Sequence, residues 1–111
     1  MKFTANWRVS FLDMNDKFLN TLGLCFKAGK LGVGHDASKE AVRKNRAALC
    51  ILCCDASDRL KKEFHNMTNI KIADTVYSMS DIKSAIGTAS GVLTVNDAGF
   101  AKLIDGTLRK E

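Results

Sequence analysis

Two glycines, Gly32 and Gly34, begin the segment that comes closest to a known catalytic pattern. The string from Gly32 to Ala37 fits the G-x-G-x-x-A form of a dinucleotide-binding turn. That chemistry needs a buried strand leading into the first glycine, so that a pyrophosphate meets the N-terminus of the next helix. Residues 25–30 are instead expected to end a helix, and 111 residues are too few for such a domain plus a catalytic one. A nucleotide-dependent enzyme is therefore the disfavoured alternative.

Thiols and imidazoles are the other reactive side chains. Cys50 and Cys53 have the spacing of half a zinc site, but no second ligand pair follows, and a strand would point the two thiols to opposite faces. Reduced thiols in a core, Cys54 included, are the simpler interpretation. His35 and His65 are single in the sequence, and neither a nucleophile elbow nor a spaced carboxylate pair is present. We expect no metal, no cofactor, no catalytic residue and no small-molecule substrate.

Basic side chains recur along the segment after Asp36, which can cap a helix running to about residue 46. At about 100° per residue, Lys39, Arg43 and Arg46 fall within about 60° of one another. Their stripe lies opposite an apolar one, formed by Ala37, Ala41 and Val42. Such a stripe is often only a solvated face. Here it runs from a glycine-containing turn, where free backbone amides and a helix dipole can also meet phosphate.

The composition favours a folded protein with an affinity for polyanions. Seventeen Lys and Arg against twelve Asp and Glu give a net charge of +5, and 46% of the residues are hydrophobic. The longest apolar run, residues 49–54, is far shorter than the roughly 20 residues that a membrane helix needs. No secretory signal is readable, so we expect a cytoplasmic protein that contacts no membrane.

The periodicity of apolar residues alternates between helix and strand. A helix of about fourteen residues is expected from Asn15 to near Gly29, and further helices are expected to begin at Asp55 to Ser57, at Ser78 and at Asp97. Ser78 with Asp81 three residues later forms a capping-box-like start for the helix that Gly87 ends, and Asp97 caps the final helix. Strands are expected at 49–54, 70–73 and 91–95. This alternation predicts a single α/β domain built as a three-layer α/β/α sandwich on a small sheet.

The first fourteen residues stand apart from this pattern. Apolar side chains alternate with polar ones from Phe3 to Phe11, which is the period of a strand. An N-terminal extension before a domain at 15–111 is the equal alternative. If the segment is an edge strand, self-association or partner binding through residues 3–11 is expected.

Four short strings stand out along the rest of the chain: LGLCFKAGKL at 22–31, RAAL at 46–49 leading to DAS at 55–57, AIG at 85–87, and TVNDAGFA at 94–101. In this order they resemble the kink-turn-binding ribosomal protein family, L-seven-Ae and its bacterial ribosome-associated relatives of unassigned role. The resemblance covers residues 15–104. It implies a four-stranded mixed sheet, and RNA contact through the turn and helix after Gly34 and the loop leaving Gly87 and Thr88.

Kink-turn recognition itself is not expected. The family's RNA-binding members carry an Asn-Glu pair and, three residues past the Glu, a Lys, all aimed at guanine edges. The matching positions here are Asp36, Ala37 and Glu40. An ionised Asp36 accepts hydrogen bonds only and would repel a guanine O6. The resemblance therefore implies the fold and not the specificity.

A non-enzymatic, ribosome-associated protein that holds structured RNA, most simply ribosomal RNA, through phosphate contacts is the leading hypothesis. The rival is a protein-interaction module on the same fold. The residues expected to contact RNA are Lys30, Gly34, His35, Asp36, Lys39, Arg43, Arg46, Gly87 and Thr88.

Overall fold

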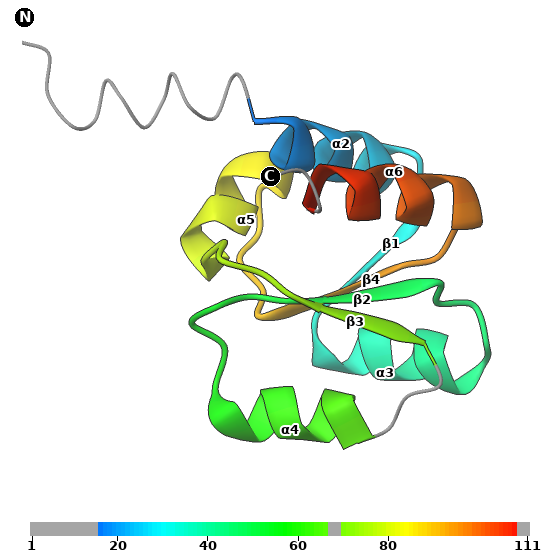
Figure 1. Cartoon of the computed structure of the whole chain (residues 1–111), viewed down its shortest axis with the longest axis vertical. Helices are drawn as coiled ribbons and strands as arrows, with labels where there is room; N and C mark the ends of the chain where they lie inside the picture. The colour runs from blue at the N-terminus through cyan, green and yellow to red at the C-terminus, as the bar shows by residue number, and fades with distance from the viewer. Residues whose placement is uncertain (1–15, 67–69, 109–111) are drawn as a thin grey trace, which may run out of the picture.

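The computed structural model describes residues 16–66 and 70–108, and the expected N-terminal strand or extension at residues 1–14 lies outside them. Helices and strands alternate through the described chain (Figure 1). The helices are α2 (Lys17–Lys27), α3 (His35–Arg43), α4 (Asp58–Asn66), α5 (Met79–Ile86) and α6 (Ala98–Leu108). The strands are β1 (Leu31–Val33), β2 (Leu49–Leu52), β3 (Lys71–Asp74) and β4 (Val92–Val95).

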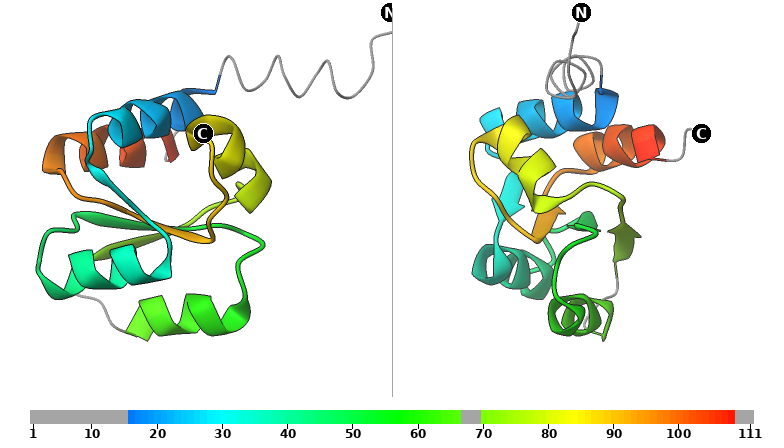
Figure 2. Two further views of the ribbon diagram at one scale, coloured as in Figure 1. Left: turned by 180° about the vertical axis from the view of Figure 1, so that it is seen from behind. Right: turned by 90° about the vertical axis from the view of Figure 1, so that its left-hand side faces the viewer.

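The four strands form one mixed sheet in the order β1-β4-β2-β3. β4 is antiparallel to both β1 and β2, whereas β2 and β3 run parallel. Helices α2, α5 and α6 cover one face of the sheet and α3 and α4 the other, as Figure 1 and the side view in Figure 2 show. The predicted α/β/α sandwich with a four-stranded mixed sheet is therefore confirmed.

The two central strands carry the core. All four residues of β2 and all four of β4 are buried, as strands covered on both faces require. One cluster packs under α2, α5 and α6 around Phe18, Leu22 and Ile82. A smaller one under α4 contains Phe64 with Leu52. Within the described residues, no helix has the length and apolar character needed to cross a membrane.

Several helix ends lie where the local sequence places them. Ser78 and Asp81 form a reciprocal capping box, with the Asp81 amide 3.1 Å from Ser78 Oγ and the Ser78 amide 2.9 Å from Asp81 Oδ2. Gly87 ends α5 with a φ of 89°, and Asp97 Oδ2 accepts from the Phe100 amide at 2.9 Å. Asp16 caps α2 through the Leu19 amide.

Helix α3 departs from the prediction at both ends. Its N-cap is Gly34, with a φ of 97°, and not Asp36, which lies in the first turn and makes no capping hydrogen bond. The helix ends at Arg43 rather than at Arg46, because Asn45 takes a left-handed conformation with a φ of 59°. The buried face also differs from the predicted apolar stripe.

Within α3, Ser38 is fully buried and donates to the Gly32 carbonyl, whereas Ala37 is exposed. Two further predictions were wrong. The three-residue strand β1 was missed, and the apolar run at 49–54 ends as a strand at Leu52, leaving Cys54 exposed. The other thiols, Cys25, Cys50 and Cys53, are buried, and burial raises their pKa values to about 11 or 12.

Candidate nucleic-acid interface

A hollow of about 370 Å³ opens between the start of β1 and one side of α3. Two cations, Lys30 and Arg46, line it together with Gly32 and Asn96. The remaining lining residues are Gly29, Ala37, Glu40 and Ala41. A concave, partly apolar surface with cations in its lining can hold a phosphate or a nucleotide.

Gly32 is a requirement of this packing. A Cβ atom on Gly32 would lie 2.5 Å from Thr94 Oγ1, so no other residue fits without movement. β1 pairs with β4 through Gly32 and Thr94, and the backbone N–H of Asn96 donates to the Lys30 carbonyl at 2.8 Å. These contacts fix the turn that carries Lys30 against the sheet.

Two buried polar atoms beside this turn have no hydrogen-bond partner among the described residues: Thr94 Oγ1 and Asn96 Oδ1. Buried polar atoms are usually paired, so these two are expected to bond to a water molecule, an ion or a ligand group. Sequence reasoning missed Asn96, although it belongs to the string at 94–101 that carries the family resemblance. Its position beside the hollow depends on the pairing of β1 with β4.

Lys30 and Arg46 are the two cations of the hollow, and Arg46 lies near enough to Glu40 to help lower the pKa of that carboxyl. Both are exposed, and within residues 16–66 and 70–108 neither takes part in an ion pair. Arg46 reaches the hollow because the turn at Asn45 redirects the chain after the helix; the Arg46 amide donates to the Ala41 carbonyl at 2.9 Å. The structure thus brings together two residues that the sequence could only predict separately.

The other two members of the predicted stripe are paired with acids. Lys39 Nζ lies 3.4 Å from a Glu63 oxygen, and Arg43 donates to Glu40 at 3.0 Å. Lys44 also lies 2.8 Å from Glu40, and its hydrogen bond holds the pKa of that carboxyl below its usual value. The stripe is therefore not a row of three free charges.

His35, the first residue of α3, is half-buried and lies between two carboxylates. Its Nε2 is 3.0 Å from Glu63 Oε1, and its Nδ1 is 3.4 Å from Asp36. Hydrogen bonds to Glu63 and Asp36 raise the pKa of the imidazole above its usual value. Glu63 was not predicted as part of the site, because the sequence carries no signal that α4 packs beside α3.

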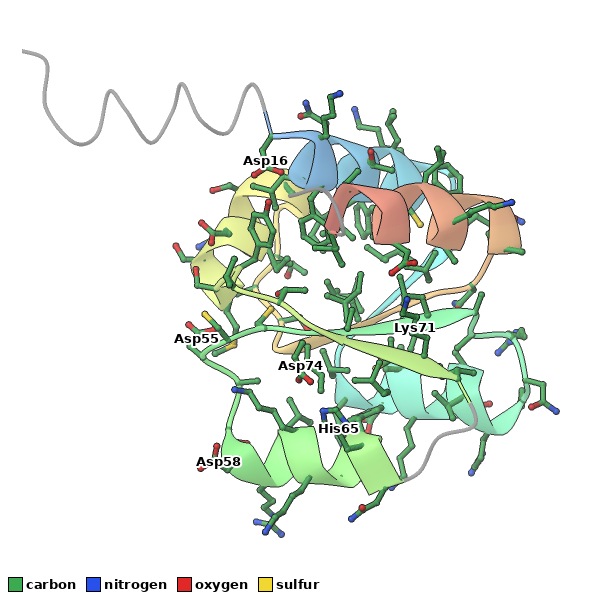
Figure 3. The ribbon with its side chains drawn as sticks, viewed as in Figure 1. Asp16, Asp55, Asp58, His65, Lys71 and Asp74 are labelled. Carbon is green, nitrogen blue, oxygen red and sulfur yellow. The ribbon has the colours of Figure 1, made fainter. Side chains whose placement is uncertain are left out.

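The remaining predicted residues lie around rather than in the hollow. The Gly34 amide donates to the Val92 carbonyl at 3.1 Å, so the loop that leaves α5 reaches the sheet beside the start of α3. Gly87 and Thr88 are exposed in that loop and do not line the hollow, and the Asp36 side chain is fully exposed. His65 is paired elsewhere, with Asp74 at 2.9 Å on the β3 side of α4 (Figure 3).

Two of the chemistries considered from the sequence, a metal site and a dinucleotide-binding turn, can be compared with the described part of the chain. No three His, Cys, Asp or Glu side chains there come together as a metal site would require. The Gly32 turn leads from an antiparallel edge strand of three residues, and not from the central parallel strand of a dinucleotide-binding fold. The cations and the hollow are suited to binding.

The sequence and the fold of this chain are similar to those of several known proteins. No protein-family model matches the chain. RNA-binding protein YlxQ from Enterococcus faecium is 30% identical over 96 residues, covering 81% of this chain and 93% of its own length. A Bacillus halodurans protein of unknown function has a TM-score of 0.79 at 27% identity and covers 86% of this chain and 99% of its own.

A Giardia lamblia 15.5 kD RNA-binding protein shares the fold at 15% identity, with a TM-score of 0.64 over 85% of this chain and 83% of its own. The similarity to YlxQ extends over most of both chains, as membership of one family requires. This chain belongs to the family of RNA-binding protein YlxQ.

Proposed function

We propose that this protein binds structured RNA without catalysing a reaction, and that the hollow between β1 and α3 is its main phosphate-binding surface. The observation that carries the proposal is that two exposed cations with no ion pair within 4 Å, Lys30 and Arg46, line that hollow. The names of YlxQ and the Giardia protein support RNA as the polyanion. The net charge of +5 acts in the same direction.

The residues predicted to contact RNA differ in whether they already form ion pairs within the protein. Lys30 and Arg46 can meet phosphate without breaking an ion pair within 4 Å, and Gly34 is the N-cap of α3, the positive end of the helix dipole. Lys39 and Arg43 must first exchange Glu63 and Glu40 for phosphate. His35, Asp36, Gly87 and Thr88 then belong to the periphery of the surface.

We also propose that the RNA partner is ribosomal. The support is the resemblance to ribosomal proteins over residues 15–104. Co-sedimentation with ribosomal subunits in a sucrose gradient, lost when salt is raised, is the expected result. Sedimentation only at the top of the gradient at low salt would refute the ribosomal part of the proposal.

A charge-reversal pair tests the phosphate surface directly. Lys30→Glu with Arg46→Glu should lower affinity for a labelled ribosomal RNA fragment at least about tenfold and reduce the slope of log affinity against log salt by about two. The matched control is Lys83→Glu with Lys102→Glu, which makes the same change of charge on α5 and α6, across the sheet from α3 (Figure 1). Equal losses in the two double variants would show that only net charge matters and would remove the hollow from the proposal.

A protein-interaction module is the second candidate. Leu24, Phe26 and Leu103 are large apolar side chains exposed on α2 and α6, at 60%, 42% and 61%. Exposed apolar surface is typical of protein interfaces. Absence of salt-sensitive RNA binding by the unaltered protein would favour this candidate.

A further inference from the structure

Glu63, on α4, contacts two of the cations that the sequence assigns to RNA binding. Its two carboxylate oxygens lie 3.0 and 3.1 Å from His35 Nε2, and one of them lies 3.4 Å from Lys39 Nζ. Helices α3 and α4 lie side by side on the same face of the sheet in Figures 1 and 2. The carboxylate therefore occupies the position from which a phosphate oxygen would accept the same protons.

The position of Glu63 is fixed by its neighbour in the core. Phe64 is fully buried beneath α4, and its ring meets the His35 ring edge-on with centroids 5.7 Å apart. Rotating α4 to move the carboxylate would expose Phe64, whose burial is worth roughly 1.5–3 kcal/mol. The hydrogen bond from His35 also holds the pKa of Glu63 below its usual value, so the carboxylate is ionised at neutral pH.

The two sides of α3 differ in consequence. His35 and Lys39 lie one turn apart on the side that faces α4, whereas Ala37 and Ala41 lie about 160–240° away and line the hollow. On the side that faces α4, Glu63 pairs with His35 and Lys39, and Asp36 lies 3.4 Å from His35, so that side carries little net positive charge. The hollow also contains one carboxylate, Glu40, but Arg43 and Lys44 pair with it and Arg46 and Lys30 add further positive charge. A phosphate therefore meets a net positive charge at the hollow and a nearly neutral surface beside α4.

We propose that Glu63 is a specificity-determining residue, an internal anion that neutralises His35 and Lys39 and thereby directs RNA phosphate to Lys30 and Arg46. This inference rests on the proposed RNA binding. Glu63 lowers the affinity for polyanions in general, because it removes one of two cationic surfaces. It raises the preference for RNA whose phosphate spacing fits the hollow.

Neutralising Glu63 tests the inference. Glu63→Gln should raise the affinity for structured RNAs of unrelated sequence about fivefold or more at low salt and steepen the salt dependence by about one unit, because Lys39 becomes available. The matched control is Asp58→Asn, which removes the same charge from the first residue of α4, labelled in Figure 3, where no ion pair with a described cation is formed. A gain no larger in Glu63→Gln than in Asp58→Asn would overturn the proposal.

The redirection of RNA needs a second comparison. In a protein already carrying Lys30→Glu and Arg46→Glu, the addition of Glu63→Gln should restore a measurable part of the lost RNA binding. Asp58→Asn added to the same background should not. Restoration by both variants, or by neither, would show that Glu63 does not control which surface RNA contacts.

An RNA-free measurement separates this inference from the proposed function. Because the chain has two histidines, NMR resolves the imidazole of His35 with His65 as an internal reference. In Glu63→Gln the pKa of His35 should fall toward its usual value, because the hydrogen bond from Glu63 is the largest cause of its increase. If the His35 pKa falls and neither protein binds RNA, the proposed function fails and the inference falls with it. If RNA binding is present and the His35 pKa does not move, Glu63 is not the residue that screens it.

Discussion

Replacing Gly32 by alanine gives the sharpest prediction for the structure that underlies the hollow. The added Cβ would lie 2.5 Å from Thr94 Oγ1, and Thr94 is fully buried in the central strand β4. Either the Thr94 side chain or one of the two strands must shift to relieve this contact, and overpacking of this kind costs roughly 1–3 kcal/mol. The next neighbours, at 3.5 and 3.6 Å, are at ordinary contact distances, so the hydroxyl is the whole obstacle.

Removal of the obstacle should remove the cost. Thr94→Ala deletes a hydroxyl that has no partner in the described chain, and in that background Gly32→Ala should cost less than about 0.5 kcal/mol. Gly106→Ala is the matched control, because its Cβ meets nothing within 4 Å inside α6 and alanine should stabilise the helix by roughly 0.5–1 kcal/mol. Urea unfolding monitored by circular dichroism measures the free energy of unfolding of the unaltered protein, of the two single variants, of the double variant and of the Gly106→Ala control. Equal effects of Gly32→Ala in the two Thr94 backgrounds would refute the packing explanation.

Three further predictions concern charge, specificity and the N-terminus. Because the pKa of His35 is raised above 6.5 in the folded protein, protonated His35 stabilises the fold below about pH 6.5, and this stability is lost as the pH rises through the folded-state pKa. The melting temperature of the unaltered protein should therefore fall as the pH rises through this interval, and that of His35→Gln should fall less. The protein should bind a kink-turn within about tenfold of any other folded RNA at matched salt, whereas Asp36→Asn, Ala37→Glu and Glu40→Lys together should create a kink-turn preference measurable by competition. Deletion of residues 1–13 should change the melting temperature little, since α2 begins at its own cap within the described residues; a large decrease would favour the strand interpretation.

The parts of the fold that could be predicted are those whose cause is local. Ser78, Asp81 and Asp97 cap helices through amides three residues away, and Gly87 ends α5 because glycine takes a positive φ without strain. The buried strands β2 and β4 are continuous apolar runs, which need no tertiary information to be recognised.

The parts that could not be predicted depend on distant partners. β1 has three residues with a glycine in the middle, too little for a periodic signal, and it is a strand because β4 pairs with it more than sixty residues later. Arg46 was assigned to the stripe of α3, but one left-handed residue, Asn45, moved it to the hollow. Glu63 could not be assigned to the site at all, since its role depends on how α4 packs beside α3.

Glu40 shows how the α3 helix of this chain differs from that of the family's kink-turn binders. Where the family's kink-turn binders carry a lysine for a guanine edge, Glu40 accepts from Arg43 and lies 2.8 Å from Lys44, as a carboxylate one turn before two cations is expected to do. The acid thus pairs with the end of α3, and where it lines the hollow it places a carboxylate rather than a base-reading cation. The cations of the hollow are Lys30, before β1, and Arg46, after α3. A surface of this kind discriminates by the spacing of phosphates rather than by the edges of bases, and so the shape of the RNA, more than its sequence, should determine what this protein binds.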